Sequence, residues 1–155
     1  MILYRIANAA HARDLSGIGA RMYGARWNQK GTAALYTATS PALATVELLV
    51  HVDANLLPSD LRLVYIEVPD DASVTIVSVA ALPKRWRAFP APSELADLGT
   101  RWVASRETLL LRVPSAVVVD EHNVLVNPAH PDFPGVRVSK VNAYTFDERL
   151  IKRGK

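Results

Sequence analysis

The sequence predicts an α+β fold in which a curved, mainly antiparallel sheet carries a few helices. Strand-like runs of apolar residues outnumber helix-like runs, and they do not alternate regularly with helices as a doubly wound parallel sheet requires. The chain has 155 residues and no Gly/Ser linker or internal repeat, so we expect a single domain over residues 1–155. A domain of this size buries about 70% of the surface that its unfolded chain exposes, so disulfides are not needed for stability.

The first part of the chain is predicted to contain two strands separated by a long loop. Residues 1–7 and 34–38 have strand patterns, and the loop spans about residues 8–31. Loops of this length inside compact domains are usually functional or disordered. This one carries several glycines and arginines, namely Gly17, Gly19, Gly24, Gly31, Arg13, Arg21 and Arg26. Glycine lets backbone approach a ligand and a guanidinium suits paired phosphate oxygens, although glycine also simply forms turns.

A helix is predicted from Ser40 to about Asp53, and Glu47 is its unusual residue. Ser40 can cap the helix start, and Pro41 suits the first turn. At about 100° per residue, Glu47 falls within a sector of apolar side chains, those of Leu43, Val46 and Val50. Burying a carboxylate is costly unless donors or cations meet it, so a buried Glu47 would indicate a function.

A plainer interpretation of Glu47 is a narrow solvated stripe on this helix. Glu47, His51 and Ala44 would then face water, and Glu47 and His51 would form a weak pair four residues apart. Glutamate is rarely fully buried, which favours this alternative when the helix is considered alone.

The rest of the chain predicts one more helix and several strands. The helix covers about residues 93–105, where Leu95, Leu98 and Trp102 recur at helical spacing and are expected in the core. A proline-rich connection over residues 83–92 precedes it. Strands are expected over residues 61–68, 74–79, 109–113, 116–119, 124–127 and about 136–146, with an acidic turn at Asp70 and Asp71 between the first two.

The composition excludes several classes of protein. With no cysteine there can be no disulfide, thiolate nucleophile or cysteine zinc site, and the four histidines lack close metal-ligand spacing, so no metal is expected. No segment has the roughly 18 apolar residues of a membrane span, and the first residues lack the features of a secretory signal. We therefore expect a cytoplasmic protein without membrane association.

The charge is mildly basic. Lysine and arginine total 18 against 15 acidic residues, for a net charge of +3 and a pI of about 9.4, which is a weak bias toward anionic partners. The densest basic segments are Lys84-Arg85-Trp86-Arg87 and the tail Leu150-Ile151-Lys152-Arg153-Gly154-Lys155, and both are expected to be solvated surface.

Standard nucleotide-binding and hydrolase motifs are absent. The segment Gly24 to Gly31 lacks the Gly-Lys-Ser/Thr ending of a Walker A loop. Gly17 to Gly24 is separated from the first strand and is not followed by a clear helix, so it is not a dinucleotide fingerprint. Ser115 has no Gly-x-Ser-x-Gly elbow around it, and its plain interpretation is a turn hydroxyl at the start of a strand.

A specific resemblance emerges from several motifs taken in order. The front half contains Gly24-Ala25-Arg26-Trp27-Asn28 with Gly31, then Tyr36, then Leu43-Ala44-x-x-Glu47 with His51. The back half contains Leu98-Gly99-x-x-Trp102, Val113-Pro114-Ser115-Ala116-Val117, Asn123-x-Leu125-x-Asn127-Pro128-x-His130-Pro131-x-Phe133 and Phe146-Asp147-x-Arg149-Leu150. Together they resemble the RES-domain family, named for an arginine, a glutamate and a serine, over nearly the whole chain.

That resemblance implies a bacterial type II toxin that depletes NAD, on a fold similar to ADP-ribosyltransferases. NAD would be consumed as a substrate, so no cofactor is implied. The implied partner is an Xre-like antitoxin that blocks the active-site cleft, and any contact with nucleic acid would come through that antitoxin. The family's site residues correspond to Arg26, Tyr36, Glu47 and Ser115, with Asn127 as a substrate-binding neighbour. The resemblance leaves open whether toxin subunits pair with each other.

The residue types suit cleavage of the nicotinamide–ribose bond. An oxocarbenium-like transition state needs fixed negative charge, which Glu47 supplies, while nicotinamide leaves as a neutral molecule and needs no second acid. Arg26 is expected to hold the diphosphate or a ribose, and Tyr36 to stack on or orient the nicotinamide ribose. Ser115 and Asn127 are expected to supply hydrogen bonds.

Three functions remain open from the sequence. The first is NAD degradation, with water or phosphate as the acceptor of the ADP-ribosyl group. The second is mono-ADP-ribosylation of a protein, which uses the same pocket with a different acceptor. The third is a non-enzymatic nucleic-acid-binding module that works through Lys84–Arg87 and the basic tail, and it gives Glu47 no role.

Overall fold

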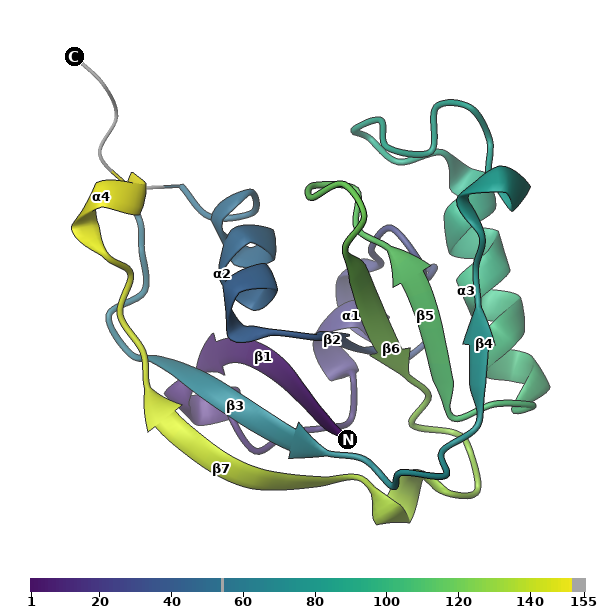
Figure 1. The fold of residues 1–155 in the computed structure, drawn as a ribbon, viewed down its shortest axis with the longest axis horizontal. Helices are drawn as coiled ribbons and strands as arrows, with labels where there is room; N and C mark the ends of the chain where they lie inside the picture. The colour runs from purple at the N-terminus through teal and green to yellow at the C-terminus, as the bar shows by residue number, and fades with distance from the viewer. Residues whose placement is uncertain (54, 152–155) are drawn as a thin grey trace.

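One seven-stranded sheet organises the chain, in the order β4-β5-β6-β2-β1-β3-β7 (Figure 1). The structure is a computed structural model that describes residues 1–53 and 55–151. The strands are β1 (Ile2–Asn8), β2 (Leu35–Ala38), β3 (Leu61–Glu67), β4 (Val74–Ile76), β5 (Leu110–Pro114), β6 (His122–Val126) and β7 (Arg137–Ala143). The last four residues of the basic tail, 152–155, lie outside the described residues.

Four α-helices accompany the sheet among the described residues. They are α1 (Ile18–Tyr23), α2 (Pro41–Leu49), α3 (Ser93–Ser105) and α4 (Glu148–Ile151), and short 3₁₀ turns occupy Ala9–His11, Val79–Ala81 and Phe133–Gly135. The bounds of α3 agree with the predicted helix. None of the helices within the described ranges is long and apolar enough to cross a membrane.

Strand pairing confirms an α+β fold with a mainly antiparallel sheet. Every neighbouring pair is antiparallel except β4 with β5, which is parallel. Figure 1 shows the curvature, because β1, β3 and β7 sweep away from the direction of β4, β5 and β6. Although β3 and β4 are consecutive in the chain, β4 is at one edge and β3 is next to the other edge, so the acidic turn does not form a hairpin.

One predicted strand is shorter than expected and another is absent, and local side-chain bonds explain both. The strand predicted over residues 74–79 ends at Ile76, and Ser78 then accepts a hydrogen bond from the Ala80 N–H to begin a 3₁₀ turn. The strand predicted over residues 116–119 is wrong, because the Ser115 hydroxyl accepts from the N–H groups of Val117 and Val118 and draws this backbone into a turn.

The ends of three other elements also differ from the prediction. α2 stops at Leu49 rather than near Asp53, since the His51 N–H bonds to the Leu48 carbonyl in a tighter final turn. The last strand covers Arg137–Ala143 rather than residues 136–146. The glycine-rich loop contains the short helix α1 and the first 3₁₀ turn, so its middle is more ordered than the pattern predicted.

The register of the strands puts α2 and α3 on the same face of the sheet. Tyr36 and Ala38 alternate with Leu35 and Thr37 on β2, so they share one face. Tyr36 packs against the cluster that includes Leu95 and Trp102 of α3, whereas Ala38 packs against Leu43 and Ala44 of α2. The opposite face carries a separate core, with Leu3, Leu35, Val64, Ile66, Leu110 and Val126 among its members. β2 therefore contacts α2 and the cluster of α3 from the same face.

Gly99 allows α3 to pack directly on the glycine-rich loop, and its substitution tests this contact. A Cβ at Gly99 would lie 1.7 Å from the Trp27 carbonyl oxygen and 2.8 Å from its carbonyl carbon. Gly to Ala inside a helix normally stabilises it by about 0.5–1 kcal/mol, but overpacking against rigid backbone costs about 1–3 kcal/mol. We expect Gly99→Ala to lower the free energy of unfolding, as measured by urea denaturation.

The matched control is Gly19→Ala on α1, where a Cβ would meet nothing within 4 Å. We expect that variant to be as stable as the wild type or more stable. Equal stabilities for the Gly99 and Gly19 variants would contradict the close packing of α3 on the loop.

Candidate active site

Glu47 lies on α2 with its carboxylate turned toward the sheet. The Ser40 hydroxyl accepts from the Leu43 N–H at 3.1 Å and Pro41 opens the first turn, as the sequence predicted. Only Leu43 and Ala44 of this helix are fully buried, and Glu47 is half-buried. α2 is therefore less buried than its apolar composition suggested, and Glu47 lies at the boundary between core and solvent.

The Glu47 carboxylate accepts two short hydrogen bonds on one oxygen. The Ser115 hydroxyl and the Asn123 amide each donate to Oε1 at 2.6 Å. A hydroxyl that donates to a carboxylate oxygen commonly lies this close. His51 is exposed and gives Glu47 no hydrogen bond or ion pair within the described part of the chain, so the expected pair on a solvated stripe is wrong.

The Ser115 hydroxyl is oriented to donate to Glu47. It follows β5 rather than starting a strand, which corrects the plain interpretation from the sequence, and it is only 3% exposed. Its Oγ accepts from the N–H groups of Val117 and Val118 at 3.1 and 3.0 Å. With its acceptor positions used by the turn, the hydroxyl proton is directed to Glu47.

Asn123 is the site residue that the sequence reasoning missed. It belongs to the motif Asn123-x-Leu125-x-Asn127, where alternation places Asn123 on the same strand face as the buried Leu125. A polar side chain on a core-facing position was the available signal. Its partner Glu47 is 76 residues away, and no local pattern reveals such a contact.

Arg26 is fixed by the connection between β4 and α3. Its Nη1 and Nη2 donate to the carbonyl oxygens of Trp86 and Ala88 at 2.6 and 3.2 Å. Burial lowers the pKa of the Arg26 guanidinium, and the charge of Glu47 opposes that shift. Arg26 and Glu47 thus share one electrostatic environment. A guanidinium has five N–H groups, so donors remain for an anionic ligand.

The basic cluster Lys84–Arg87 is only partly the solvated surface that was predicted. Lys84 and Arg85 are exposed, but Trp86 is a buried member of the core that includes α3. The Arg87 Nε donates to the Ala116 carbonyl oxygen at 3.1 Å. This segment therefore links the glycine-rich loop, through Arg26, to the turn that carries Ser115.

The Tyr36 hydroxyl is engaged with the glycine-rich loop. It donates to the Asn28 Oδ1 at 2.7 Å and accepts from the Trp27 N–H at 3.0 Å. Burial raises the pKa of the Tyr36 phenol well above its ordinary value, which keeps the hydroxyl neutral. Trp27 is 3% exposed and belongs to the core that includes α3. In this conformation Tyr36 holds the residues that follow Arg26.

The Asn127 side chain is buried and bonded to backbone groups. It is fully buried, its Nδ2 donates to the Val103 carbonyl oxygen at 3.1 Å, and its Oδ1 accepts from the Ala129 N–H at 2.9 Å. The structure does not bring it into the hydrogen-bond group of Glu47, Ser115 and Asn123. Its expected role in substrate binding stays a prediction.

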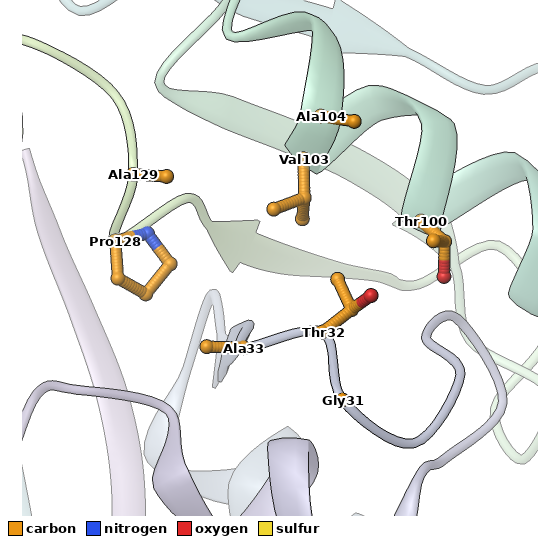
Figure 2. Close-up of a pocket in the computed structure, with 8 residues that line it drawn as sticks. All are labelled: Gly31, Thr32, Ala33, Thr100, Val103, Ala104, Pro128 and Ala129. Atoms are coloured by element: carbon orange, nitrogen blue, oxygen red, sulfur yellow. The ribbon is translucent and has the colours of Figure 1, made fainter.

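A pocket of about 340 Å³ lies elsewhere, between the end of the glycine-rich loop, α3 and the segment after β6 (Figure 2). Figure 2 shows mainly small side chains around it, those of Gly31, Thr32, Ala33, Thr100, Val103, Ala104, Pro128 and Ala129. None of the candidate site residues lines it. The hydrogen-bonded group around Glu47 is the candidate active site, and it is separate from the residues that line this pocket.

Comparison with known proteins gives an independent result. The sequence model of the family described as RES domain matches residues 2–147. A protein from Sphingobium sp. (strain YBL2), named "Prs ADP-ribosylating toxin", is 44% identical over 155 residues, which cover 97% of this chain and 96% of that protein. A protein named "Toxin Res" from Yersinia enterocolitica is 40% identical over 153 residues, covering 97% of this chain and 99% of that protein.

A solved structure shares the fold. The crystal structure of the M. tuberculosis MbcT-MbcA toxin-antitoxin complex contains a chain that matches with a TM-score of 0.72 at 21% sequence identity. The match covers 97% of this chain and 86% of that chain. The order of strands and helices is therefore one that another protein adopts with a very different sequence.

The contacts of Tyr36 predict that its hydroxyl stabilises the fold. Tyr36→Phe leaves a buried N–H of Trp27 and the Asn28 Oδ1 without this partner, and such losses cost about 1–3 kcal/mol. We expect a lower midpoint in urea denaturation. Tyr23→Phe is the control, because Tyr23 is 74% exposed and its change should stay within about 0.5 kcal/mol. Equal midpoints for wild type and Tyr36→Phe would contradict the assignment.

Proposed function

The chain belongs to the RES-domain family, and from this premise we propose that it is the toxin of a toxin–antitoxin pair and cleaves the nicotinamide–ribose bond of NAD. The observation that carries the proposal is the carboxylate of Glu47. Two donors hold its Oε1, and no residue in the described part of the chain hydrogen-bonds to Oε2. One oxygen is therefore anchored and the other is available to a substrate.

This arrangement suits a reaction in which a sugar becomes cationic. As the bond to nicotinamide breaks, positive charge develops on the anomeric carbon, and a fixed carboxylate stabilises that charge without reorganising. The bonds from Ser115 and Asn123 keep Glu47 in place before the substrate arrives. Nicotinamide takes the electron pair of the breaking bond and leaves neutral, so no second acid is required.

Arg26 is suited to hold the diphosphate of NAD or a ribose close to Glu47. Its side chain is fixed by two backbone carbonyls and still has N–H groups to donate. Tyr36 supports this role by fixing the loop that follows Arg26. In the proposal the Tyr36 hydroxyl holds the loop and its ring orients the nicotinamide ribose. Asn127 is kept in the proposal as a substrate-binding neighbour, and in the structure its amide bonds to Val103 and Ala129.

The acceptor of the ADP-ribosyl group is water or inorganic phosphate in this proposal. With water the products are ADP-ribose, nicotinamide and a proton, and with phosphate they are ADP-ribose 1″-phosphate and nicotinamide. A second candidate, transfer to a protein, is favoured by the relative named "Prs ADP-ribosylating toxin". Both candidates use the same cationic transition state, so Glu47 has the same role in each.

The proposed partner is an Xre-like antitoxin that blocks the site. Two observations support an antitoxin: relatives named "Toxin Res", and the fold shared with a chain of a toxin-antitoxin complex. NAD is available in the cytoplasm, which is the proposed location. Co-expression with a neighbouring small helix-turn-helix protein, followed by co-purification, tests the partner directly.

Removal of the Glu47 charge tests the proposed chemistry. Glu47→Gln keeps the shape of the side chain, and loss of such an electrostatic group costs about a hundred- to a thousandfold in rate. We expect the purified variant to remain folded by circular dichroism and to lose NAD consumption. Glu94→Gln, at the exposed start of α3, is the control and should match the wild type. Wild-type turnover in Glu47→Gln would exclude Glu47 as the charge stabiliser.

The acceptor can be identified from the products. Purified protein is incubated with NAD labelled in its adenosine half, with and without phosphate and with cell extract. We expect free ADP-ribose or its 1″-phosphate as the main labelled product. Label that stays mainly on a protein of the extract would instead establish the second candidate.

A further inference from the structure

We infer that Asn123 is a positioning residue, which fixes the Glu47 carboxylate in the orientation needed for catalysis. The inference rests on the proposed function and deepens it. Its basis is the 2.6 Å bond from the Asn123 Nδ2 to the Glu47 Oε1, the same oxygen that Ser115 holds. Neither composition nor motif assigned a role to this residue.

The sheet fixes the place of Asn123 from both sides. On β6 it is opposite Ala38 of β2 and opposite Val113 of β5. Paired positions of this kind project side chains on the same face. The Ala38 side chain is small and packs beneath α2, so it leaves space beside Asn123 for the longer side chain of Glu47.

Ser115 extends the same arrangement. Its N–H donates to the Glu121 carbonyl oxygen at 2.9 Å, which continues the β5–β6 pairing one residue beyond β5. Ser115 is therefore a diagonal neighbour of Asn123 on that face. The two donors come from adjacent strands and converge on one oxygen, whereas a single donor would let the carboxylate rotate about its terminal torsion.

The chemistry of the pair also fixes the orientation of the Asn123 amide. An ionised carboxylate only accepts hydrogen bonds, so the amide nitrogen and not its oxygen must face Glu47. Serine and asparagine are neutral donors. They hold the carboxylate without neutralising it, which preserves its full charge for the developing cation. A cationic side chain at position 123 would instead compete with the substrate for that charge.

A positioning role for Asn123 predicts that its loss changes kcat but not KM. Glu47 interacts more strongly with the cationic transition state than with NAD itself, so loss of its orientation lowers kcat and leaves KM for NAD nearly unchanged. Hydrogen bonds to charged groups correspond to about a tenfold to a hundredfold change in rate. We expect Asn123→Ala to lose kcat within that range.

Asn123→Asp provides a second variant of the same shape, which decides the matter if Asn123→Ala fails to fold. Its carboxyl must hold a proton to donate to Glu47 and repels it when ionised. We expect the ratio of variant to wild-type kcat to rise as the pH falls from about 8 to about 6. The charged and titratable groups near the site are Arg26, which senses the charge of Glu47, His51 on the turn after α2, and His122, which contacts Arg112. Wild type and variant share these groups, so the ratio cancels their common contribution to the pH profile.

The control is His122→Ala, on the neighbouring position of β6, whose side chain contacts Arg112 rather than Glu47. Thermal unfolding is measured for every variant, and the control should keep the wild-type kcat. If Asn123→Asp keeps wild-type kcat at every pH, or if its loss appears in KM alone, the positioning role is overturned. A wild-type protein that leaves NAD intact refutes the proposed function instead, so the two failures are distinguishable.

Discussion

The site depends on one constraint, which is that a half-buried carboxylate must have donors. Glu47 is carried by a helix whose neighbouring side chains are mostly apolar, and Ser115 and Asn123 supply the bonds that its Oε1 needs. Both donors come from beyond residue 110, so α2 can reach them only when β5 and β6 are paired and joined to β2. The candidate site therefore requires the pairing of β2, β5 and β6.

Arginine side chains link the other parts of the site. Arg26 joins the glycine-rich loop to the carbonyl oxygens of Trp86 and Ala88, and Arg87 joins that segment to the turn at Ala116. Tyr36, on β2, holds the glycine-rich loop through its bonds to Trp27 and Asn28. The loops near Glu47 are therefore fixed by side-chain hydrogen bonds as well as by regular secondary structure. Such preorganisation lets charge act at once on a transition state.

The sequence predicted the elements that depend on local patterns. The helix Ser93–Ser105 follows from the spacing of its apolar residues, and the cap at Ser40 follows from residue type. Errors arose where a side chain competes for backbone bonds, as Ser115 does after β5. Asn123 was missed and the plain pair of Glu47 with His51 was wrong, because both depend on contacts between distant strands. The motifs containing Arg26, Tyr36, Glu47 and Ser115 were found by resemblance, whereas their hydrogen bonds required the fold.

In the proposed function, Glu47 is held on one oxygen so that the other faces the ribose of NAD. The most direct measurement is a crystal structure of the protein with a non-cleavable NAD analogue. We expect the Glu47 Oε2 to accept a hydrogen bond from a hydroxyl of the nicotinamide ribose while Ser115 and Asn123 still donate to Oε1. An analogue bound elsewhere, such as in the pocket beside Thr100, with Glu47 making no contact to it, would contradict the account.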